Sequence, residues 1–118
     1  MNKIWLIGRI ANDLELVTTN SGKTLCEFTL AVKKPVQKDE TDFFRCIVWG
    51  KSAENLVNYQ SKGQLIAVTG AVHIEKYEDN DGILRKNCKI TVDNVVFLSK
   101  SQEKPKFGDL EIDEDLPF

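Results

Sequence analysis

The sequence predicts a small all-β domain with one short helix, and two patterns carry this prediction. Five segments are rich in β-branched and apolar residues, and clusters of turn residues separate them. One segment after the third of these strands changes to the 3.6-residue period of a helix. Three strands, a helix and two more strands within about 100 residues are typical of a five-stranded OB barrel, in which the helix closes one end. An SH3-like barrel is the structural alternative, but the helix favours the OB barrel.

The first three expected strands cover residues 3–10, 24–33 and 42–50. The tripeptide Asn-Ser-Gly at 20–22 marks a turn before the second strand. A polar stretch that contains a proline, 34–41, is expected to form the loop before the third strand.

A helix is expected over residues 51–63, between the third and fourth strands. Ser52 is in position to cap its start, and Gly63 is in position to end it. The side chains that would share its apolar face are Ala53, Leu56 and Val57.

The last two expected strands, 64–78 and 84–98, form a hairpin around the turn sequence at 79–82. Glycine inside a strand often marks a bend or a bulge, so Gly70 is expected to do so here. Long strands interrupted in this way can curl enough for a small sheet to close.

Charge is divided unevenly along the chain. Residues 1–100 hold 14 Lys/Arg and 12 Asp/Glu, a balance of +2, whereas residues 101–118 hold 2 Lys and 6 acids, a balance of −4. The second part also lacks any periodicity. We therefore expect an OB domain at 1–100 and a disordered acidic tail at 101–118.

The composition argues against catalysis, metal binding and membrane insertion. The odd number of cysteines, the absence of a CxxC pair and a single histidine give no metal-ligand spacing, so reduced thiols and no cofactor or metal are expected. There is no Gly-rich phosphate loop and no GxSxG motif, which predicts a binding protein rather than an enzyme. No apolar run approaches the ~20 residues that span a bilayer, so a cytoplasmic protein is expected. The cysteines are Cys26, Cys46 and Cys88.

Alternation in the third strand separates a core face from an outer face. The uniformly apolar set is expected in the core and consists of Phe44, Cys46 and Val48. The other set mixes rings with a cation and consists of Phe43, Arg45, Ile47 and Trp49.

The fourth strand repeats this arrangement. Its apolar face consists of Ile66, Val68, Val72 and Ile74, and its other face carries His73, Glu75 and Tyr77. Exposed rings beside cations suit a single-stranded nucleic acid, because bases stack on the rings while cations hold the phosphates. We therefore predict stacking roles for Phe43, Trp49 and Tyr77, on a surface that does not read base sequence.

Other cations concentrate in the first two strands, the loop after the second strand and the last hairpin. This distribution is compatible with a groove across the barrel. Trp5 shares a face with Ile7 and Arg9, and alternation leaves open whether it lines a subunit interface, the core or the groove. The candidate phosphate contacts in these segments are Lys3, Arg9, Lys33, Lys34, Arg85 and Lys86.

Four stretches carry a resemblance to a known family: NKIWLIGRI, NSGKTLCEFTLAV, DFFRCIVWGKSAENLVNY and KGQLIAVTGAVHIEKY. With them, residues 2–98 resemble the bacterial and phage single-stranded DNA-binding proteins. The third stretch is the most specific, since it combines an acid, two rings, an arginine and Gly-Lys before the helix. The resemblance implies a homotetramer that coats single-stranded DNA, stacking by the same three rings, and phosphate contacts by Arg45 and Lys51.

The last residues, DEDLPF, resemble the acidic, Pro-Phe-ending peptide with which this family recruits replication, repair and recombination proteins. An apolar pocket with a basic rim can capture the ring and the terminal carboxylate together. The acids upstream can steer the encounter. The resemblance thus implies a partner-binding tip at Asp113, Glu114, Asp115, Leu116, Pro117 and Phe118.

The chain departs from the family pattern at three places. The loop at 34–41 has no aromatic residue, His73 and Glu75 stand where the family is more basic, and the linker at 101–112 is short. Within the same class, an OB module for RNA or a primosome-type accessory protein is the alternative. From another class, the alternative is an interaction adaptor whose aromatic face is a protein interface.

Overall fold

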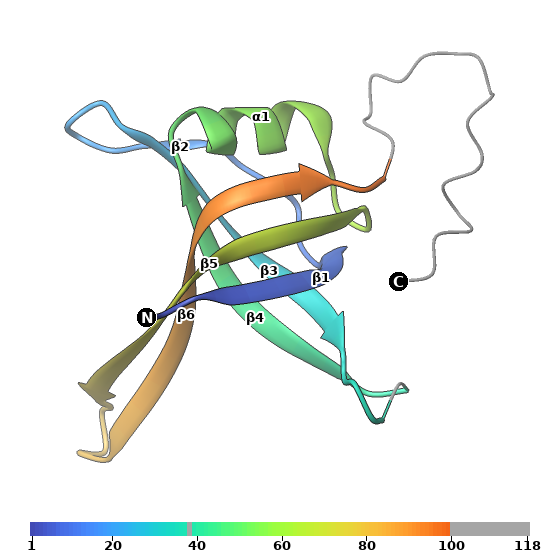
Figure 1. The fold of residues 1–118 in the computed structure, drawn as a ribbon. Coiled ribbons are helices and arrows are strands. Elements are labelled where there is room, and N and C mark those ends of the chain that lie inside the picture. The colour runs from blue at the N-terminus through green and yellow to red at the C-terminus, as the bar shows by residue number, and fades with distance from the viewer. Residues whose placement is uncertain (38, 100–118) are drawn as a thin grey trace, which may run out of the picture.

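The computed structural model describes residues 1–37 and 39–99, which form six strands and one helix (Figure 1). The predicted disordered tail and its tip lie outside these residues. No helix within the two described ranges is long and apolar enough to cross a membrane. The elements are β1 (Ile4–Ile10), β2 (Val17–Thr18), β3 (Thr24–Lys33), β4 (Thr41–Trp49), α1 (Lys51–Tyr59), β5 (Leu65–Glu78) and β6 (Leu84–Phe97).

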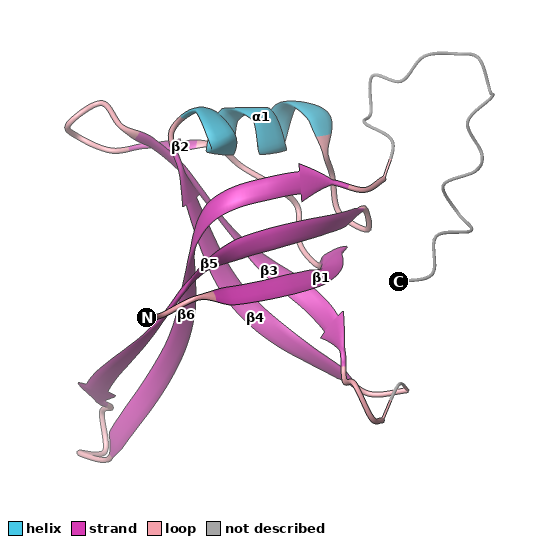
Figure 2. Ribbon diagram, viewed as in Figure 1, coloured by secondary structure: helices cyan, strands magenta, loops and turns pink. Residues whose placement is uncertain are grey.

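The strands form one sheet that closes on itself. Its order is β1-β5-β6-β4-β3-β2, and β1 also pairs with β3 at Arg9 and Ile10. Among the described strands, β4 and β6 run parallel and the other pairs are antiparallel. Figure 2 shows α1 across one end of this closed sheet. The prediction of an all-β fold of the OB type, with the helix after the third long strand, is confirmed.

β2 is a strand that the sequence pattern did not predict. It has two residues, Val17 and Thr18, which pair with Leu25 and Thr24 of β3 around the turn at 20–22. A strand of two residues shows no alternation, so sequence periodicity cannot detect it.

The core is built from the inward faces of the long strands and from α1. The expected assignment is confirmed for Cys46 and Val48 of β4 and for Ile66 and Val68 of β5, while Phe44 is partly buried. Burying a large apolar side chain contributes about 1.5–3 kcal/mol, so these positions hold the barrel together. The other buried apolar residues are Ile10, Cys26, Phe28, Leu30, Ala53, Leu56, Ile90 and Val92.

The helix begins and ends differently from the prediction. Gly50 is its N-cap at φ 68°, and no side chain of the described residues bonds the cap, so Ser52 does not have the predicted role. The helix ends at Tyr59 because Gln60 is already extended, at φ −129° and ψ 163°. Gly63 follows in a turn at φ 93°, a value that favours glycine. The predicted apolar face does pack on the core, through Ala53, Leu56 and Val57.

A β-bulge divides the long β5–β6 hairpin, at the position where the sequence predicted a bend. Asp93 is the extra residue on β6, with no residue opposite it on β5. A β-carbon on Gly70 would lie 2.2 Å from the carbonyl oxygen of Thr91, so only glycine lets the two strands approach this closely. The pairs on either side of the bulge are Thr69–Asn94 and Gly70–Val92.

Beyond the bulge, the hairpin continues as a two-stranded arm, residues 74–78 and 84–88, which projects from the barrel at the lower left of Figure 1. Ile74 lies on the same side of β5 as Val68, yet it is 56% exposed. The prediction that Ile74 belongs to the core is wrong, because the strand has left the barrel at this point and no core covers it.

The turn of the arm is held by one carboxylate, that of Asp79. It accepts a hydrogen bond from the Arg85 guanidinium at 2.8 Å, and from the backbone N–H groups of Ile83 and Asp81 at 2.9 Å each. The hydrogen bond from Arg85 has the largest effect on the pKa of Asp79, and with the backbone donors it holds this pKa below its usual range. The carboxylate therefore stays charged and orders the turn at neutral pH.

Candidate nucleic-acid interface

The odd-numbered residues of β4 point outward, as alternation predicted. Phe43 is 65% and Trp49 is 43% exposed, and Arg45 between them is exposed as well. At 3.2–3.4 Å per residue, the two rings are about 20 Å apart along the strand. One base therefore cannot contact both rings, but successive bases of one strand can. Their outward orientation is confirmed, and their stacking role remains a prediction.

Basic side chains line up across this face at the level of Arg45. Arg45 of β4 pairs with Lys89 of β6, and Lys89 pairs in turn with His73 of β5. On its other side, Arg45 pairs with Thr29 of β3. Directly opposite residues project from the same face of a sheet, so these side chains are neighbours. We call Arg45, Lys89 and His73 the basic row, which begins on β4 between the two rings and runs over β6 to β5.

Lys89 is one of the cations of the last hairpin, but it was not among the predicted phosphate contacts. Its Nζ atom lies 3.4 Å from Oε2 of Glu27 on β3. The outward side of β6 was hard to assign from sequence because the bulge at Asp93 shifts the alternation by one residue. Lys89 and Asn94 therefore both point outward although one is odd-numbered and the other even-numbered.

The third predicted ring, Tyr77, lies on the arm and is 51% exposed. It pairs across the arm with Arg85, so its ring and the guanidinium share one face. Tyr77 follows His73 on the same side of β5, which means that this face continues the surface of the basic row outward. Nε of Arg85 is engaged by Asp79 at 2.8 Å.

The remaining predicted phosphate contacts are dispersed over the molecule. Arg9 donates a hydrogen bond to the carbonyl oxygen of Gly63 at 3.0 Å. Lys51, at the start of α1, follows Trp49 by two residues and so lies near the β4 surface. Among the described residues, no ion pair engages Lys33, Lys51 or Lys86. Two others are in ion pairs, Lys3 with Asp93 at 2.8 Å and Lys34 with Asp42 at 2.7 Å.

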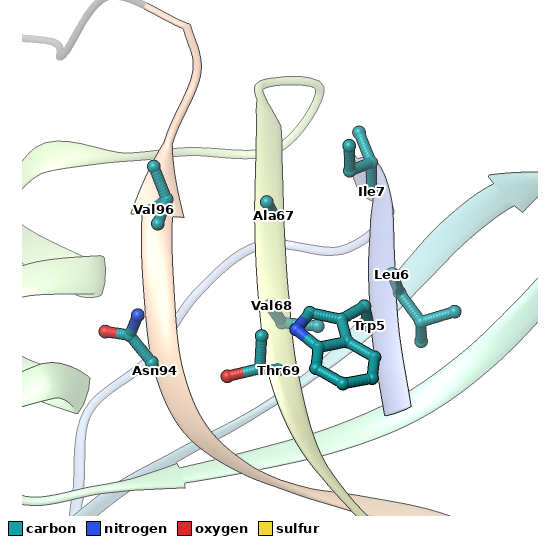
Figure 3. Close-up of a pocket in the computed structure, with 8 residues that line it drawn as sticks. All are labelled: Trp5, Leu6, Ile7, Ala67, Val68, Thr69, Asn94 and Val96. Carbon is teal, nitrogen blue, oxygen red and sulfur yellow. The ribbon is translucent and has the colours of Figure 1, made fainter. Parts of the chain in front are cut away.

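Trp5 lies on a different surface, the outer face of β1, β5 and β6. Figure 3 shows it beside Thr69. Both residues line a hollow of about 370 Å³. Trp5 is 68% exposed, which excludes the core among the three locations that the sequence left open. The other residues around the hollow include Ile7, Ala67, Asn94 and Val96.

Asp93 lies on this second surface as well. Its carboxylate accepts hydrogen bonds from Lys3 at 2.8 Å and from the Thr69 hydroxyl at 2.6 Å. These two contacts hold the pKa of Asp93 below its usual range, and the contact with Lys3 has the larger effect. The structure therefore brings Lys3 to the bulge and to Trp5 rather than to the basic row.

The outer edge of β1 is open beside the same surface. Residues 4–7 pair with β5 on one side, and no described strand pairs with them on the other. An unpaired edge can accept a further strand. Trp5 and Ile7 of this same strand line the hollow.

The described residues hold no group of three or more His, Cys, Asp or Glu side chains that could bind a metal ion. Burial raises the pKa of the Cys46 thiol to about 12, and it raises the pKa of Cys26 as well. Both thiols are therefore neutral near pH 7 and poor metal ligands or nucleophiles. The rings and cations gathered on the β4 face suit noncovalent binding.

Residues 1–98 match the Single-strand binding protein family. The chain is 41% identical to Single-stranded DNA-binding protein 3 of Listeria innocua, over 86% of this chain and 66% of that protein. It is 42% identical to Single-stranded DNA-binding protein 2 of Clostridium acetobutylicum, over 83% and 77%. It is 35% identical to Single-stranded DNA-binding protein 1 of Streptococcus pyogenes, over 100% and 99%. The family is one of binding proteins rather than enzymes, as predicted, and the chain belongs to the Single-strand binding protein family.

Proposed function

We propose that this protein binds single-stranded DNA without sequence preference, and that it coats and protects the strand. The observation that carries the proposal is the outer face of β4, where the exposed rings of Phe43 and Trp49 flank Arg45. Bases stack on such rings at about 1–3 kcal/mol each, and neighbouring cations hold the phosphates. The names of the similar proteins support this choice over RNA or a purely protein partner.

The bound strand would follow the rings along β4 and continue over the arm to Tyr77. Stacking uses the faces of the bases and leaves their hydrogen-bonding edges unread, so affinity should vary little with sequence. Arg45 and Lys51 would be the main phosphate contacts. Among the other predicted contacts, Lys3 has the least support, because it lies on the face of Trp5. The remaining phosphate contacts that we propose are Arg9, Lys33, Lys34, Arg85 and Lys86.

Intrinsic tryptophan fluorescence during titration with oligo-dT tests this proposal. The Trp5→Phe variant leaves Trp49 as the single reporter. We expect saturable quenching that weakens as salt rises, because phosphate contacts release counterions. A folded protein that shows neither quenching nor oligo-dT binding would contradict the proposal and favour the adaptor, in which the aromatic face is a protein interface.

We further propose that the protein acts as a homotetramer. The hollow around Trp5 and the open edge of β1 support self-association, since an exposed apolar patch and an unpaired strand edge both invite contact. These surfaces lie apart from the rings of β4, so assembly and DNA binding do not compete for the same side chains.

Residues 101–118 are proposed to form a flexible tail that follows the DNA-binding domain at 1–100. Its tip would recruit proteins of DNA replication, recombination and repair in the cytoplasm. The balance of −4 in the tail and its ending on Leu-Pro-Phe support this role. Deleting Phe118 should leave oligo-dT affinity unchanged and abolish the capture of such proteins from a bacterial extract. If capture survives the deletion, the tip is not the recruiting element.

A further inference from the structure

An acidic side chain, Glu27, lies among the basic groups of the β4 face. Its Oε2 atom is 3.4 Å from Nζ of Lys89. Glu27 is on β3 and Lys89 is on β6, so the ion pair reaches across the intervening strand β4. Glu27 is opposite Ile47 on β4, whereas Lys89 is opposite Arg45. The ion pair therefore runs diagonally over β4, between Arg45 and Ile47.

This position lies between the two exposed rings of β4, Phe43 and Trp49. A strand of DNA that follows the rings from one to the other must pass over the ion pair. The side chain of Lys89 is 25% exposed and that of Glu27 is 53% exposed, so both are open to solvent and to a phosphate. Arg45, the neighbour of Lys89 in the basic row, has no ion-pair partner among the residues that the structure describes.

We infer that Glu27 sets the affinity of the proposed DNA site by occupying Lys89 in the free protein. The inference rests on the proposed function. A phosphate that binds Lys89 must first replace the Glu27 carboxylate, so one ion pair is exchanged for another and the net gain is small. The released carboxylate then lies close to the phosphate and repels it. Arg45 binds without this exchange, whereas Lys89 contributes little while Glu27 is charged.

Removing the charge of Glu27 should therefore strengthen DNA binding. Glu27→Gln keeps the size of the side chain and leaves Lys89 free for a phosphate. We expect oligo-dT to bind about threefold more tightly at low salt, the scale of one exposed ion pair. The salt dependence should steepen as well, because each additional neutralised phosphate changes the slope by about 0.7 for a single strand.

The experiment measures oligo-dT affinity of the full-length protein at several salt concentrations for four proteins: wild type, Glu27→Gln, Lys89→Gln and the double variant. Glu15→Gln is the matched control, since it removes an exposed carboxylate that makes no ion pair within the described ranges. The gain in Glu27→Gln should disappear when Lys89 is also replaced, and the control should bind like wild type. Thermal melting establishes that each variant is folded, which is expected because both side chains are at the surface.

Two results would overturn the inference. In the first, Glu27→Gln binds with the same affinity and salt slope as wild type, or more weakly. In the second, the gain persists with Lys89→Gln, which would mean that Glu27 repels DNA directly. Arg45→Ala, measured alongside, separates this inference from the proposed function. If Arg45→Ala weakens binding while Glu27→Gln changes nothing, the inference alone fails. If neither substitution has an effect, oligo-dT binds elsewhere on the protein. The inference and the proposed site on β4 then fail, while the binding of single-stranded DNA itself stands.

Discussion

Val48 and Trp49 are adjacent in the chain and lie in opposite environments. Val48 is 1% exposed in the core, whereas Trp49 is 43% exposed on the outer face. Strand geometry causes this difference, because successive side chains point to opposite sides of the sheet. The indole of Trp49 can be removed without opening a cavity in the core, so its effect on binding can be measured separately from stability.

Trp49→Ala should weaken oligo-dT binding by about 1–3 kcal/mol, the contribution of one stacked base. Trp49→Phe keeps a ring and should retain most of the affinity. Fluorescence anisotropy of a labelled oligo-dT measures both variants, and thermal melting checks that they are folded. Wild-type affinity in a folded Trp49→Ala protein would remove this residue from the binding site.

Gln60 is expected to affect the stability of the protein rather than its binding. It is 1% exposed, and neither atom of its side-chain amide has a hydrogen-bond partner among the described residues. A buried polar group without a partner costs about 1–3 kcal/mol. Leucine has a similar size and no polar atom. Gln60→Leu should therefore raise the free energy of unfolding by about that amount.

Guanidinium denaturation measures this change. Asn58→Leu, at an exposed position of α1, is the control and should change the unfolding free energy by less than about 0.5 kcal/mol. A less stable Gln60→Leu protein would mean that the amide makes favourable contacts in the native state.

Among the elements, the β5–β6 hairpin takes part in both surfaces of the molecule. Its inner part contributes Ala67 and Val96 to the hollow around Trp5, and its outer part contributes Tyr77 to the proposed DNA surface. The bulge at Gly70 is the boundary between the two parts. Its geometry therefore should matter both to the proposed assembly and to the proposed DNA binding.

Gly70→Ala should destabilise the protein by about 2 kcal/mol or more, because the new β-carbon would meet the Thr91 carbonyl at 2.2 Å. Gly22→Ala is the comparison, since Gly22 has φ 89° and open space around it. That variant should lose only about 1 kcal/mol, through the strain of an L-residue at positive φ. Chemical denaturation compares them, and equal losses would show that close approach of the strands is not the constraint at Gly70.

At the scale of the whole molecule, we propose separate surfaces for assembly and for DNA binding. Light scattering should give a mass of about 54 kDa, four times the 13.4 kDa of the chain. Trp5→Glu places a charge on the face proposed for assembly and should lower this mass. Val36→Glu, at an exposed position of the β3–β4 loop, should not. A wild-type protein that is monomeric at micromolar concentration would contradict the tetramer.

Local patterns predicted the five long strands and the outward rings of β4, because alternation and turn residues depend on neighbours in the chain. They did not predict β2 or the cap at Gly50. Nor did they place Lys89 beside Arg45, because that contact exists only where β6 runs parallel to β4. The basic row thus depends on pairing between distant segments, which no short stretch of sequence encodes.

The parallel pairing of β4 with β6 also sets the order in which the proposed binding surface forms during folding. Arg45 and Lys89 are 44 residues apart in the chain, whereas β5 and β6 are joined by the short turn at 79–82. Closing a longer loop loses more entropy, so hairpins form before such distant contacts. A chain that has formed the β3–β4 and β5–β6 hairpins, but not the contact between β4 and β6, exposes the rings without the basic row. If DNA binds this surface as proposed, the protein gains the ability to hold it only with the final closure of the barrel. Half-folded chains then do not compete with native protein for the strand.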